Sequence, residues 1–254
     1  MPRFIPIAGL TVKEGIRSRL FLVIFFFAVL FLLSSIALSD FTFAERKKIL
    51  IDLGLTFLIL FGLLVSVVLG ISLIHKDVDQ RSIYFVLSKP LKRSSYLIGK
   101  YLGLLLILFF NLLFMMAIQI FLLLVVAGEF EPSLFLAVYP IFLELSLIAA
   151  LTIFFASFTT PALVVFFTIS TYIIGHSLDI LEFTLRRITG ISKYFLKAMM
   201  YIFPNLDFLD FKSAIIYKQP VGFGEYLWVT LYVLIYIGAL LYFAKVIFEE
   251  RELK

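Results

Sequence analysis

Six long apolar runs constrain this chain more than any other feature of its sequence. Each has about the 20 apolar residues that an α-helix needs to cross a bilayer, or more. Lipid offers the backbone no hydrogen-bond partners, so a run that crosses the bilayer must be helical. We therefore expect an all-α integral membrane protein with a single transmembrane domain over residues 1–254. The six expected spans are 20–38, 51–74, 96–127, 134–155, 162–181 and 226–248.

The composition agrees with lipid as the main solvent of the chain. Hydrophobic residues make up 63% and charged residues 15%, whereas soluble domains are about 45–50% apolar and 25% charged. The chain has no cysteine, which excludes disulfides, thiolate metal sites and cysteine nucleophiles. A net charge of +5 fits basic loops at one membrane face better than nucleic-acid binding. We predict a multi-pass protein of the cell membrane that contacts lipids and no nucleic acid.

The positions of Lys and Arg predict the orientation, because cytoplasmic loops are enriched in them. With six spans, the N-terminus, the segment after the second span and the C-terminal tail share one side. That side carries more than half of the 22 Lys and Arg residues, so we predict that both termini are cytoplasmic. Arg46, Lys47 and Lys48 in the first outer loop oppose the rule, but neighbouring acidic residues balance them.

Residues 7–19, IAGLTVKEGIRSR, form two apolar stripes when they are placed on a helix. Such a helix can lie in the membrane interface with its basic side chains toward the headgroups. The alternative is a simple positively charged flank. The charged residues of the expected interfacial helix are Lys13, Glu14, Arg17 and Arg19.

The first apolar run has a further interpretation as a cleaved signal peptide. Ala37-Leu38-Ser39 is an acceptable small-residue cleavage site. The basic region before the run, however, is long and itself patterned. We therefore treat 20–38 as a retained span.

The most charged stretch of the chain is HKDVDQRSIYFVLSKPLKRSSYLIGKYLG, from His75 to Gly103. Asp77–Leu87 can form a short helix, which Pro90 must end because proline cannot continue a helix. Ser94 or Ser95 can then cap the third long helix. From there to the end of the third span the helix measures roughly 50 Å, against about 30 Å of hydrocarbon core. We expect this helix to extend into the cytoplasm and to carry the short helix as a docking feature.

The sequence contains no recognised catalytic motif. Gly99-Lys100 is not part of a phosphate-binding loop, because Ser94 and Tyr101 occupy places that need a glycine and a Ser or Thr. We expect Gly99 to permit close helix packing instead. The zinc-protease and serine-hydrolase motifs are absent, and we expect packing or interfacial roles for the two histidines. We predict a chain that is not an enzyme and holds no metal and no cofactor.

Three polar residues inside the expected spans are candidates for function. A charge at mid-bilayer costs about 2.5–3.5 kcal/mol on insertion scales, so Glu144 must face protein or water or be protonated. It lines a substrate path or an inter-subunit contact, or it is a buried carboxyl bonded to a neighbouring helix. Asn111 and Gln119 share roughly one helix face. Hydrogen bonding between helices is their simpler interpretation, and a substrate path is the alternative.

The segment 182–225 is expected to lie outside the membrane. Residues 192–203 predict a helix on the outer leaflet, with Lys193 and Lys197 on one face. Trp228 is expected to be an interfacial aromatic anchor.

DVDQRSIYFVLSKPLKRSSYLIGKYLG resembles the first cytoplasmic loop of ABC-2-type transporter permeases. Arg81 stands where many members have glycine, a departure typical of a subgroup similar to the nitrous-oxide reductase maturation permease. TVKEGIRSRL resembles the interfacial elbow helix of the family, and FTTPALVVFFTISTYIIGH and YIFPNLDFLDFKS resemble its fifth span and outer segment. The matching loop positions are Asp79, Ser82, Leu87, Ser88, Lys89, Pro90, Arg93, Gly99 and Lys100.

The resemblance implies a permease subunit that couples ATP hydrolysis by a separate ATPase to substrate movement across the membrane. Two permease copies would pair, and ATP and Mg²⁺ would bind the cytosolic ATPase subunit. The short helix between spans two and three would be a coupling helix that docks on this ATPase. The implied coupling residues are Asp79, Arg81, Ser82, Leu87, Lys89, Pro90 and Arg93.

An alternative function is a membrane scaffold or assembly factor that recruits a cytosolic partner without transport. A secondary transporter would need charged residues deep in several spans, and Glu144 is the one clear candidate. The sequence therefore favours the permease.

Overall fold

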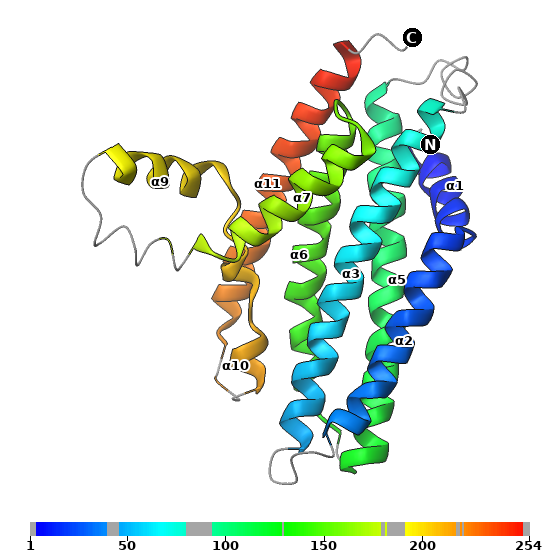
Figure 1. The fold of residues 1–254 in the computed structure, drawn as a ribbon, viewed down its shortest axis with the longest axis vertical. Helices are drawn as coiled ribbons and strands as arrows, with labels where there is room; N and C mark the ends of the chain where they lie inside the picture. The colour runs from blue at the N-terminus through cyan, green and yellow to red at the C-terminus, as the bar shows by residue number, and fades with distance from the viewer. Residues whose placement is uncertain are drawn as a thin grey trace.

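The computed structural model of the chain describes residues 4–39, 46–79, 93–128, 130–178, 181, 191–216, 219 and 221–250. Five long helices form a bundle (Figure 1), and each can cross a membrane by its length and composition. The described residues contain no strand, so the expected all-α membrane fold is confirmed. The long helices are α2 (Arg19–Ser39), α3 (Arg46–Asp79), α5 (Arg93–Ala127), α6 (Ser133–Ala156) and α11 (Phe223–Glu250).

Helix α6 is the most buried of the long helices and contacts α3, α5, α7 and α11. Polar groups on its neighbours bond to its backbone carbonyls. Tyr101 of α5 donates to the Ser146 carbonyl at 3.3 Å, and Ser66 of α3 contacts the Leu145 carbonyl at 3.5 Å. Such bonds hold membrane helices together where water offers no competing partner.

Helix α7 (Pro161–Gly175) is shorter than the expected fifth span, 162–181. It begins at proline, which fits the first turn of a helix because its missing N–H has no partner to lose there. It ends at Gly175 because the chain near residue 206 crosses that end, and the Leu206 N–H donates to the Gly175 carbonyl at 3.2 Å. At 15 residues, α7 is roughly 22 Å long, which is less than the hydrocarbon core.

Helix α1 (Ile5–Ile16) precedes α2 and packs along the first turns of α5. A Cβ on Gly103 would lie 2.5 Å from Thr11 Cβ and 2.9 Å from the Ala8 carbonyl oxygen. A Cβ on Gly99 would lie 2.7 Å from Ile7 Cβ. The expectation that Gly99 permits close packing is therefore confirmed, and the partner helix is α1.

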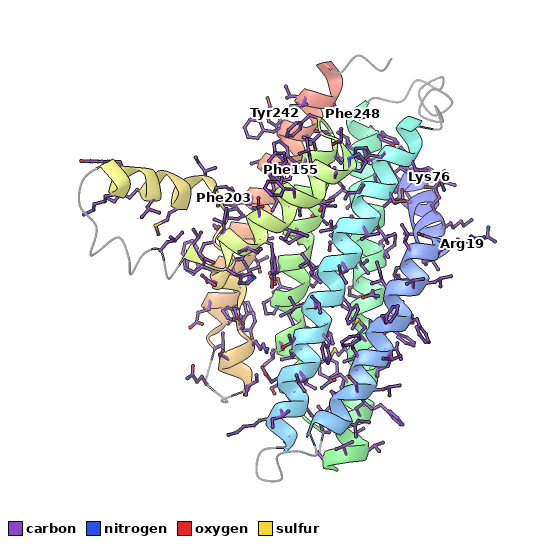
Figure 2. The ribbon with its side chains drawn as sticks, viewed as in Figure 1. Arg19, Lys76, Phe155, Phe203, Tyr242 and Phe248 are labelled. Atoms are coloured by element: carbon purple, nitrogen blue, oxygen red, sulfur yellow. The ribbon has the colours of Figure 1, made fainter. Side chains whose placement is uncertain are left out.

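Helix α1, the end of α3, the start of α5 and the last turns of α11 lie toward one end of the bundle (Figure 1). Tyr96 of α5 stacks there on Phe248 of α11, with ring centroids 6.0 Å apart and both side chains buried. Figure 2 shows Lys76 and Phe248 at this end. The helix ends that bound residues 80–92 therefore lie near both ends of the chain, as six spans require. That this side is cytoplasmic stays a prediction.

Residues 191–216 form three short helical elements beside the bundle. Helix α9 (Ile191–Ile202) matches the helix expected over 192–203 and projects sideways from the bundle (Figure 1). Its place on the outer leaflet stays a prediction. The 3-10 helix η1 (Asp207–Leu209) and α10 (Lys212–Ile216) lead back toward α11.

We expect Gly103→Ala to destabilise the chain by about 1–3 kcal/mol, because the added methyl overpacks the α1–α5 contact. Thermal unfolding of the purified chain in detergent measures this change. Gly9→Ala on α1 is the matched control, since a Cβ at Gly9 meets no atom within 4 Å. Equal unfolding midpoints for the two variants would contradict the close packing.

Candidate functional site

Glu144 lies in the middle of α6 and pairs with a histidine. Its Oε1 lies 2.8 Å from His176 Nε2, and its side chain is 2% exposed. His176 directly follows α7, and the Tyr172 ring meets the His176 ring edge to face at 4.7 Å. The structure thus gives the intramembrane carboxyl a partner on a neighbouring element. Glu144 is therefore a buried carboxyl bonded to a neighbouring element, and whether it also lines a substrate path stays a prediction.

A segment that we call the strap, residues 204–212, crosses the end of α7. A Cβ on Gly175 would lie 2.7 Å from Leu206 Cγ and 2.8 Å from the Pro204 carbonyl oxygen, so a larger residue would push the strap away. The Asn205 N–H donates to the Tyr232 hydroxyl of α11 at 2.7 Å. The strap is therefore anchored on both α7 and α11.

The strap brings further charges to the pair. Asp207 Oδ1 lies 3.5 Å from His176 Nδ1, so both ring nitrogens of His176 face a carboxylate. Lys212 Nζ lies 2.7 Å from Asp52 Oδ1 and also donates to Thr56 Oγ1, both on α3. The Lys212 N–H donates to Asp210 Oδ1 at 3.1 Å. The strap thus contacts α3 through Lys212 and, through Asp207, the histidine that pairs with Glu144 of α6.

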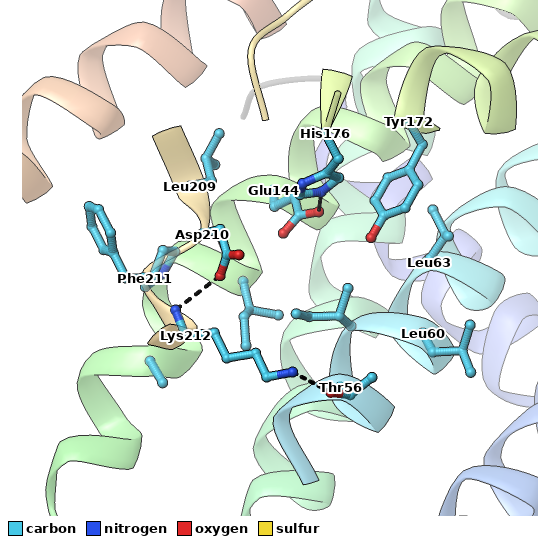
Figure 3. A pocket seen from close by; sticks show the side chains of 14 residues that line it. Thr56, Leu60, Leu63, Glu144, Tyr172, His176, Leu209, Asp210, Phe211 and Lys212 are labelled. Carbon is cyan, nitrogen blue, oxygen red and sulfur yellow. Dashed lines mark hydrogen bonds and ion pairs between the residues drawn. The ribbon is translucent and has the colours of Figure 1, made fainter. Parts of the chain in front are cut away.

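Several of these groups line a cavity of about 300 Å³ between α3, α6, α7 and the strap, which we call the inner cavity (Figure 3). Its volume is at the lower end of the range of small-molecule sites. Figure 3 shows Glu144 beside His176 and Lys212 reaching toward Thr56. The other lining residues are mostly apolar. The charged and polar lining consists of Thr56, Glu144, Tyr172, His176, Asp210 and Lys212.

This arrangement suits binding and proton exchange better than covalent chemistry. The imidazole between two carboxylates can hold a proton, and the cavity offers acceptors at one end and an ammonium at the other. No serine or cysteine nucleophile lies among the lining residues. Within the part of the chain that the structure describes, no group of three His, Cys, Asp or Glu side chains can hold a metal ion.

Sequence reasoning singled out Glu144 and missed its surroundings. The sequence predicts a packing or interfacial role for His176 and does not single out Asp207 or Lys212. A usable signal was present, because a buried carboxyl needs a partner and His176 is the one histidine near the expected outer half of the membrane.

The other polar candidates within spans lie away from this cavity. Gln119 Nε2 donates to the Leu50 carbonyl of α3 at 2.8 Å, which is a contact between helices. Asn111 is buried, and neither polar atom of its side chain has a partner among the described residues. The structure does not bring Asn111 or Gln119 into the inner cavity.

The interfacial residues lie on and just after α1. Lys13, Arg17 and Arg19 are exposed. Glu14 Oε2 lies 3.2 Å from Lys100 Nζ, and the Lys100 side chain is only 5% exposed. The lysine of the Gly-Lys pair therefore ties α1 to α5 and lies 5.7 Å from the centre of the Tyr96 ring.

Most predicted coupling residues lie outside the described residues. These are Arg81, Ser82, Leu87, Lys89 and Pro90. Asp79 is the last residue of α3, and Arg93 is the first residue of α5. The expected helix over residues 77–87 begins within α3, and its remainder is not described.

Comparison with known families matches residues 5–253 to the family described as ABC-2 family transporter protein. The match covers nearly the whole chain, including α1, the five long helices and the inner cavity. No curated protein matches the chain. The likeness to the nitrous-oxide reductase maturation permease stays a prediction.

We expect the Glu144–His176 pair to show coupling in a double-mutant cycle. Removing one partner leaves the other buried without it, so Glu144→Leu plus His176→Leu should cost about 0.5–3 kcal/mol less than the sum of the single variants. Unfolding in detergent measures the four free energies. A cycle of Glu144→Leu with Ser177→Ala, whose hydroxyl bonds within its own turn, is the control and should be additive. An additive Glu144–His176 cycle would contradict the pair.

Proposed function

Because the chain belongs to the ABC-2 family of transporter proteins, we propose that it is the membrane-spanning permease of an ATP-driven transporter. A multi-pass membrane transport role follows from the family and the apolar helices. The proposal adds a separate ATPase subunit that docks on the segment between α3 and α5, and a second copy of the permease. It also adds a substrate path through the inner cavity.

The placement of helix ends supports docking at one end of the bundle. Helices α3 and α5 have 34 and 35 residues, so each is roughly 50 Å long and exceeds the hydrocarbon core by about 20 Å. Both ends that bound residues 80–92 lie at the same end of the bundle (Figure 1). This gives a cytosolic partner access to the most charged stretch of the chain.

The packing of α5 can transmit a displacement from the proposed docking segment to other helices of the bundle. Its first turns contact α1 through Gly99 and Gly103, and Lys100 is paired with Glu14. A displacement of the start of α5 must therefore move α1 with it, because packed helices shift as rigid units. ATP binding drives such a shift only if the docked ATPase contacts the segment differently in its two states.

The inner cavity supports the substrate path. Thr56, Ile59, Leu60 and Leu63 of α3 form one of its walls, while Glu144 and His176 form another. Helix α3 therefore connects the proposed docking end with the cavity. A shift of α3 relative to α6 would change the cavity volume and the Lys212–Asp52 contact together.

We expect Arg81→Glu and Arg93→Glu to lower the affinity of the chain for its ATPase about tenfold or more, because reversed charges oppose a complementary surface. The measurement is co-purification of the ATPase with the tagged chain and the rate of ATP hydrolysis by the complex. Lys197→Glu, an exposed lysine on α9, is the matched charge reversal and should leave both unchanged.

Unchanged co-purification and unchanged hydrolysis in both arginine variants would reject the docking site. If no ATPase accompanies the wild-type chain and another cytosolic protein does, the chain is a scaffold and the transport proposal fails.

A further inference from the structure

A second cavity, which we call the outer pocket, lies on the other side of the strap, between the strap and α11. Its volume is about 550 Å³, which is in the usual range for small-molecule sites. Four of its seven lining residues are aromatic, two are acidic and none is basic. The lining residues are Asp207, Phe208, Phe211, Glu225, Trp228, Val229 and Tyr232.

The aromatic rings of the outer pocket come from two elements that are fixed to each other. Phe208 and Tyr232 meet nearly at right angles, with ring centroids 6.1 Å apart and an interplanar angle of 77°. The Tyr232 hydroxyl accepts the Asn205 N–H, which holds this ring against the strap. Phe208 and Trp228 remain 55% and 74% exposed, so protein does not cover their faces. The pocket thus presents open ring faces on a preformed frame.

Among the described residues, the basic groups nearest the strap are already paired with carboxylates. Lys212 is paired with Asp52 on α3, and His176 lies between Glu144 and Asp207. Glu225 lies in the first turn of α11 and faces the same pocket. Among the described residues that line the two cavities, carboxylates therefore outnumber basic groups.

Ring faces attract cations through their negative quadrupole, and aromatic walls are how proteins recognise quaternary ammonium groups. An interfacial aromatic belt would account for exposed Trp228 and Tyr232. It would not account for the two carboxylates, Asp207 and Glu225, that line the pocket among these rings. We propose that the outer pocket binds an organic cation, a protonated amine or a quaternary ammonium group, as the outer station of the substrate path. This substrate class rests on the proposed transport function.

The strap gives the two cavities a direct connection. Asp207 lines the outer pocket, and its Oδ1 is 3.5 Å from His176, which lines the inner cavity. Phe211 lines both cavities. A cation that leaves the outer pocket for the inner cavity therefore meets the two carboxylates that line it, Glu144 and Asp210. An organic cation therefore suits both the outer pocket and the inner cavity.

The chain carries its own reporter for this site, because Trp228 is its single tryptophan. The experiment titrates the purified full chain, in nanodiscs of phosphatidylglycerol, with choline and records tryptophan emission. The control ligand is 3,3-dimethylbutan-1-ol, which has the shape of choline without its charge. We expect a saturable emission change with choline and binding at least about tenfold weaker with the neutral alcohol.

Variants that keep Trp228 then test the lining. Tyr232→Leu, Phe208→Leu and Glu225→Gln should each weaken choline binding about threefold to thirtyfold, the size of one cation–aromatic or charge contact. Tyr242→Leu is the matched control, because Tyr242 is an exposed aromatic residue of α11 outside the pocket. Asp207→Asn tests the carboxylate at the strap, and the near-UV spectrum of each variant reports its fold.

Equal responses to choline and the alcohol would overturn the proposal, as would pocket variants that bind choline like Tyr242→Leu. Phosphatidylcholine nanodiscs distinguish two sources of the cation. Loss of choline binding there supports the proposal with a lipid headgroup as the ligand, and retained binding supports a free cation. The assay contains no ATPase, so its failure leaves the permease assignment standing and removes the substrate class alone.

Discussion

The contact between Glu144 and His176 is the interaction on which the middle of this molecule depends. A carboxyl in the core of a bilayer needs a partner close by, and the partner here stands at the end of a helix that is too short to cross the core. The strap crosses the end of α7 at Gly175, where the Leu206 N–H donates to the Gly175 carbonyl. The strap in turn separates the inner cavity from the outer pocket. The Glu144–His176 contact thus lies where a short helix, the strap and two adjacent cavities meet.

The long helices could be predicted from the sequence because hydrophobicity alone determines where a chain can lie in lipid. The observed helices α2, α3, α5, α6 and α11 extend the expected spans by only a few residues. The packing role of Gly99 also followed from the failure of the nucleotide-binding pattern. The end of α7 did not follow, because the expected span was drawn through Leu181. The polar residues after Gly175, which could have marked a helix end, were included in it.

The surroundings of Glu144 were beyond prediction for a related reason. His176, Asp207 and Lys212 reach the cavity through contacts between residues that are far apart in sequence. Helical periodicity places a residue on a face but does not say which helix that face meets. The predicted coupling residues could not be compared with the structure in the same way, since most of them lie outside the described residues. Their positions came from resemblance, and their roles await the docking experiment.

Helix α7 is held at both of its ends by other elements. At its start, His75 Nε2 of α3 donates to the Thr159 carbonyl in the turn before it, at 3.0 Å. At its far end, the strap bonds to Gly175. Helix α7 is thus fixed at its start to α3. At its far end it is bonded to the strap, which Asn205 links to α11. Relative sliding of α3 and α11 would tilt α7 and move the strap, whose residues line both cavities.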